Sequence, residues 1–134
     1  MIPDRWAASV PAELLKLHGE ALLLLEINPA RSHELARLCL GKVISNFCAI
    51  HYPRLVDQVA ELCDLWEAHA VPQDVSPTSI RLLDEFCRRS EANRHLDKDP
   101  SITVDAFHVL ERLFDDWYVA RADRALRRSR IGLV

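Results

Sequence analysis

Apolar residues recur at intervals of three and four along most of the chain, the spacing that places side chains on one face of a helix. No segment alternates apolar and polar residues with the period of two that is typical of a half-buried strand. Five segments follow the helical pattern, and they cover residues 11–27, 29–50, 53–71, 77–96 and 101–128.

Prolines separate these segments, and proline is favoured in the first turn of a helix. Asn28 and Ser76 each stand directly before a proline, and both side chains are of the kind that caps a helix N-terminus. Pro53 either starts the third helix or kinks the second. The sequence therefore predicts an all-α fold, a five-helix, up-and-down helical bundle with a long C-terminal helix, in a single domain over residues 1–134.

Composition narrows the classes of function. The 134 residues include only three glycines, about a third of the average usage, which disfavours glycine-rich phosphate loops. The apolar run at residues 21–25 is too short to cross a membrane, and Glu20 and Glu26 flank it. We therefore expect a soluble, cytoplasmic protein with no membrane partner.

Metal and thiol chemistry is only partly represented. A carboxylate-bridged metal site in a helical bundle needs two Glu-x-x-His pairs and two further glutamates, whereas this chain offers Asp105-x-x-His108 with Glu111 one turn later. We expect no metal ion and no cofactor. The four cysteines form no CxxC pair and stand among apolar residues, so we expect buried thiols at Cys39, Cys48, Cys63 and Cys87.

Charge is distributed unevenly along the chain. The net charge is −3, yet the residues from Trp117 onward hold five arginines against Asp123 alone, so this tail carries +4 and the remainder −7. The arginines of the tail are Arg121, Arg124, Arg127, Arg128 and Arg130. An acidic stripe at helical spacing lies in the third segment and consists of Asp57, Glu61, Asp64 and Glu67. The basic tail is able to contact phosphates, or the acidic stripe of a second copy.

One short motif points to RNA chemistry. Arg89 and His95 are separated by five residues, a spacing that resembles the Arg-x(4–6)-His motif of HEPN-type ribonucleases, which are small all-helical proteins. The resemblance implies metal-independent cleavage in a cleft between two copies, with the arginine on the phosphate and the histidine assisting attack by the 2′-hydroxyl. Family members usually have Asn, Asp or His after the arginine, where this chain has Ser90.

The aromatic residues of the long last helix allow two interpretations. Trp117 and Tyr118 belong either to the core or to an interface in which they and Leu126 dock on a partner. No catalytic set is complete. We therefore predict a small non-catalytic protein–protein interaction module, such as an adaptor, an immunity or antitoxin-like protein or an assembly subunit, that forms a homodimer. The predicted interface consists of Trp117, Tyr118, Arg121, Arg124, Leu126 and Arg128. The alternative is an RNA-directed bundle, either a ribonuclease that uses Arg89 and His95 or a nucleic-acid binder that uses the arginine tail.

Overall fold

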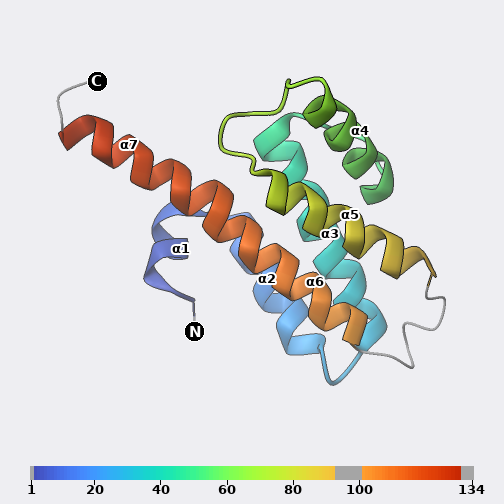
Figure 1. The fold of residues 1–134 in the computed structure, drawn as a ribbon. Coiled ribbons are helices and arrows are strands. Elements are labelled where there is room, and N and C mark those ends of the chain that lie inside the picture. The colour runs from blue at the N-terminus through green and yellow to red at the C-terminus, as the bar shows by residue number, and fades with distance from the viewer. Residues whose placement is uncertain (1, 93–100, 131–134) are drawn as a thin grey trace.

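The computed structural model describes residues 2–92 and 101–130, and every regular element in these ranges is helical (Figure 1). The all-α prediction is confirmed for this part of the chain. The elements in chain order are α1 (Asp4–Ser9), α2 (Ala12–Leu24), α3 (Pro29–Cys48), α4 (Leu55–Glu67), α5 (Pro77–Ala92), α6 (Ser101–Leu113), the π-helical segment η1 (Phe114–Val119) and α7 (Ala120–Arg130).

Two helix starts follow the predicted capping chemistry. The Asn28 side chain accepts a hydrogen bond from the Arg31 backbone N–H at 3.2 Å, directly before α3. Ser76 Oγ accepts one from the Ser79 N–H at 3.2 Å at the start of α5. These bonds satisfy N–H groups that have no partner inside the helix.

The end of α3 resolves the ambiguity at Pro53. Ala49 adopts the left-handed conformation, with φ at 56°, and stops the helix there. Pro53 therefore lies in the connection between α3 and α4. It neither kinks the second helix nor stands within the third.

The N-terminus differs from the predicted arrangement of five helices. The short helix α1 precedes α2, and its buried residue is Trp6. Because α1 has no hydrophobic repeat of its own and is held by its contact with η1, helical periodicity does not reveal it. At the other end, α6, η1 and α7 follow one another without a break as one long helical rod (Figure 1).

The helices share one hydrophobic cluster. Helix α3 packs against α2, α4 and α6, while α5 packs against α4 and α6. The largest fully buried side chains include Trp117, Phe86 and Phe114. Leu38, which the apolar pattern places on the core face, is instead 49% exposed, because only part of the α3 circumference is covered by neighbouring helices.

Candidate interaction surface

Helix α7 is the element with the least contact to the rest of the molecule. None of its eleven residues is buried, and it projects beyond the bundle as the end of the long rod (Figure 1). It carries the basic tail predicted from the sequence. Its exposed face is therefore the candidate interaction surface.

One side of α7 is tied to the connection between α4 and α5. Arg121 Nε lies 2.9 Å from Asp74 Oδ2, and Arg124 forms a second ion pair with the same carboxylate. The Arg121 guanidinium also stacks over the Phe47 ring, 3.7 Å from its centroid. Arg128 lines the same shallow hollow of about 230 Å³ as these groups. Arg121 and Arg124 therefore bind within their own chain.

The opposite side of α7 faces away from these contacts. With about 100° of rotation per residue, Leu126 and Arg130 lie roughly 140° and 180° around the helix from Arg121. Leu126 is 52% exposed, and Arg127 and Arg130 beside it are exposed as well. We call Leu126, Arg127 and Arg130 the outer face of α7.

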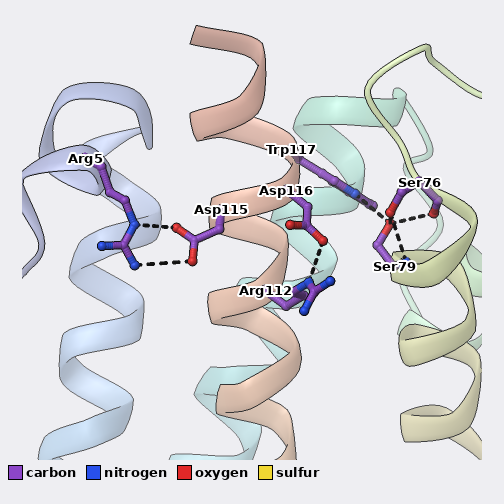
Figure 2. A network of polar contacts seen from close by, with 7 residues as sticks. All are labelled: Arg5, Ser76, Ser79, Arg112, Asp115, Asp116 and Trp117. Carbon is purple, nitrogen blue, oxygen red and sulfur yellow. Dashed lines mark hydrogen bonds and ion pairs between the residues drawn. The ribbon is translucent and has the colours of Figure 1, made fainter. Parts of the chain in front are cut away.

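Trp117 is not a surface residue. Its side chain is fully buried, and its Nε1 donates a hydrogen bond to Ser79 Oγ at 2.9 Å (Figure 2). Ser79 Oγ in turn donates to the Ser76 carbonyl at 2.8 Å. The core alternative therefore holds for Trp117, which no partner can reach in this conformation.

Tyr118 is half-buried and packs edge-on against Phe47, with ring centroids 5.2 Å apart. Burial raises the pKa of its hydroxyl to about 12. The predicted interface thus narrows to its C-terminal part, because its aromatic members belong to the bundle.

The two aspartates of η1 have separate partners, which the sequence pattern did not reveal. Asp115 accepts hydrogen bonds from Arg5 Nε and Trp6 Nε1, both at 2.7 Å, whereas Asp116 lies on Arg112 Nε at 2.6 Å (Figure 2). Burial opposes ionisation of Asp115, but the bonds from Arg5 and Trp6 outweigh it and lower its pKa. These carboxylates hold α1 and the rod in place.

The acidic stripe lies on α4 and faces solvent. Asp57, Asp64 and Glu67 are exposed, and Glu61 is half-exposed. Within the described residues, none of the four forms an ion pair with a neighbouring basic side chain. The stripe is thus available to a cationic partner.

The residues of the other predicted sites do not assemble. Arg89 Nη1 lies 3.1 Å from Asp105 Oδ2, so both the arginine of the ribonuclease motif and the aspartate of the metal motif are already paired. His95 lies outside the described residues. In the part of the chain that the structure describes, no three His, Cys, Asp or Glu side chains form a metal-binding group.

The cysteines follow the prediction in part. Cys39 and Cys87 are buried, while Cys48 and Cys63 are half-buried. Burial raises the pKa of both Cys39 and Cys48 to about 12. These two thiols stay protonated and unreactive at neutral pH.

A polar groove of about 450 Å³ along α3 was not anticipated from the sequence. Ser45 Oγ and His51 Nδ1 form a hydrogen bond in it. Its cations Arg37 and Lys42 contact Ser90 Oγ at 2.6 Å and Glu13 Oε1 at 2.7 Å. Because these cations are paired within the chain, the groove offers a ligand less positive charge than its composition indicates.

None of the described helices combines the length and the apolar character needed to cross a membrane. The chain matches no protein-family model, no curated protein and no solved structure.

Proposed function

We propose that the protein is a small non-catalytic protein–protein interaction module that pairs with a second copy of itself through α7. An adaptor, an immunity or antitoxin-like protein and an assembly subunit all work in this way. The observation that carries the proposal is a helix of eleven residues with no buried side chain.

Such a helix gains little from its own chain. Isolated helices shorter than about 12–15 residues are marginal in water, and α7 has only exposed ion pairs on one side to hold it. Docking the outer face would bury Leu126 and order the last turns, so a partner supplies the stabilisation that the bundle does not.

The charge pattern favours a second copy as the partner. Arg127 and Arg130 on the outer face of α7 complement the acidic stripe on α4, whose carboxylates have no basic partner among the described residues. In a two-fold symmetric dimer each copy would offer both surfaces, so the contact forms twice. Electrostatic complementarity of this kind selects the partner and sets the orientation.

Charge reversal followed by sedimentation velocity tests this pairing. The parent chain is expected to sediment as a dimer at low salt, and Arg127→Glu with Arg130→Glu should convert it to a monomer. Asp57→Lys with Asp64→Lys should do the same. Combining all four substitutions should restore the dimer, because the charges are then exchanged between the two surfaces.

Arg31→Glu is the matched control. Arg31 is an exposed arginine in the first turn of α3, paired with Glu34 at 2.9 Å, and its reversal should leave the dimer intact. Circular dichroism confirms that each variant keeps its helices. A parent chain that stays monomeric at all concentrations contradicts the proposal, as does failure of the fourfold variant to regain the dimer.

Nucleic-acid binding by the same arginines is the competing outcome. A monomeric chain that binds a single-stranded RNA oligonucleotide, with an affinity that falls steeply as salt rises, would assign the tail to phosphate contacts. Cleavage of that RNA in chelator, lost in His95→Ala, would assign the motif of Arg89 and His95 to catalysis.

A further inference from the structure

A second pocket lies away from α7, between α1 and α2. Its volume is about 530 Å³, within the range of about 300–1,000 Å³ that is typical of small-molecule sites. Trp6, Leu15 and His18 are its buried members, and the half-exposed Leu22 and the exposed Leu23 extend the apolar surface. The proposed contact of α7 does not involve any of these residues.

Gly19 lines this pocket from the interior of α2. Glycine disfavours a helix interior, so its presence there usually reflects a left-handed backbone or a close neighbour. Neither applies here, because Gly19 has a helical φ and a Cβ added to it would meet no atom within 4 Å. What a side chain at this position would occupy is the pocket itself.

His18 is the buried polar residue in the pocket lining. It is 5% exposed, and its Nε2 has no hydrogen-bond partner. The rings of Trp6, Phe107 and Phe114 surround it, with centroids 5.6–5.7 Å from the imidazole. Burial lowers the pKa of His18, so the ring is neutral at neutral pH. A buried polar atom without a partner is uncommon in folded proteins, since it loses its bond to water and gains none in return.

We propose that this pocket binds a small, uncharged, largely apolar molecule that carries one hydrogen-bonding group. The apolar part would fill the space beside Gly19, and the polar group would pair with His18 Nε2. Lys16 and Glu20 also line the pocket, and their opposite charges give no net preference for an ionic ligand. A hydroxyl is the best match, because it can donate to or accept from a neutral imidazole.

Two probes of similar shape test both parts of the proposal. Two-dimensional NMR of the ¹⁵N-labelled full chain follows titrations with 2-naphthol, which carries a hydroxyl, and with naphthalene, which does not. We expect saturable shifts of the backbone amides of Trp6, His18 and Gly19 with 2-naphthol. Naphthalene should bind at the same amides roughly tenfold more weakly, the equivalent of about 1.4 kcal/mol for one hydrogen bond.

Variants separate the space from the hydrogen bond. Gly19→Leu should abolish binding of both probes because the new side chain fills the pocket, whereas His18→Phe should remove the preference for 2-naphthol and leave naphthalene bound. Leu38→Ala, an exposed leucine outside the pocket, should bind as the parent does. If Gly19→Leu does not fold, as judged by circular dichroism, Gly19→Ala should still weaken both probes.

Three results would overturn the proposal. One is the absence of saturable shifts at these amides with 2-naphthol. Another is a folded Gly19→Leu variant that binds like the parent, or, where that variant does not fold, undiminished binding by Gly19→Ala. The third is equal affinity of the parent chain for 2-naphthol and naphthalene, which would remove the role of His18.

Discussion

Two helical glycines illustrate how much depends on single residues. Gly19 in α2 faces open space, whereas a Cβ on Gly41 in α3 would come to 3.0 Å from Gln58 Oε1. Gln58 cannot easily give way, because its Nε2 donates to the carbonyls of Gly41 and Ile50 at 3.0 and 2.9 Å. The same substitution should therefore have opposite effects at the two sites.

Gly19→Ala should raise the free energy of unfolding by about 0.5–1 kcal/mol, because alanine restricts the unfolded chain and fits the helix. Gly41→Ala should lower it by about 1–3 kcal/mol, because the buried Gln58 amide loses bonds when it moves. Urea unfolding of the two variants and the parent measures both changes. A loss of stability in Gly19→Ala would show that its position is not open.

His33 makes stability depend on pH. It is 3% exposed, and burial, with a smaller contribution from the nearby charge of Arg37, lowers its pKa to about 4. The unfolded chain, with an ordinary histidine pKa of about 6.5, binds a proton first as pH falls. The unfolded state is thereby favoured, so the stability should decline from about pH 6.5 down to about pH 4.

His18, whose pKa is also lowered by burial, contributes in the same direction. His33→Gln should therefore reduce, without abolishing, the slope of the unfolding free energy between pH 6.5 and 4. Urea unfolding at several pH values within this window gives that slope. An unchanged slope in the variant would mean that His33 is protonated equally in both states.

At the scale of elements, local chemistry predicts what local chemistry determines. The caps at Asn28 and Ser76 are satisfied by backbone N–H groups within three residues, so residue type and the adjacent proline were enough to place the starts of α3 and α5. The long last helix was foreseen for the same reason, since its apolar repeat continues from Ser101 to Tyr118.

Elements set by distant contacts were not foreseen. Helix α1 is held by Arg5 and Trp6 on Asp115, residues 110 and 109 positions away in the chain. The π-helical turn η1 has no distinctive sequence pattern. Likewise, the burial of Trp117 depends on Ser79 of α5, and only the packed structure decides between the two interpretations of that residue.

At the scale of the whole molecule, the charge polarity inferred from the sequence takes a physical form. The acidic stripe lies on the bundle, and the basic residues lie on a helix that projects from it (Figure 1). The candidate surface could be found in outline because it depends on charge and helical spacing. Its outer face could not, because the sequence does not reveal that Asp74 engages Arg121 and Arg124.

A chain that ends at Val119 separates the role of α7 in folding from its role in association. Removing residues 120–134 deletes no buried side chain among those described. The lost contacts are the exposed pairs with Asp74 and the stacking of Arg121 on Phe47, together about 1–2 kcal/mol. The bundle should therefore keep its helices and a cooperative urea transition, while sedimentation velocity should show a monomer. A dimer that survives the truncation would place the interface elsewhere, and an unfolded chain would make α7 part of the fold.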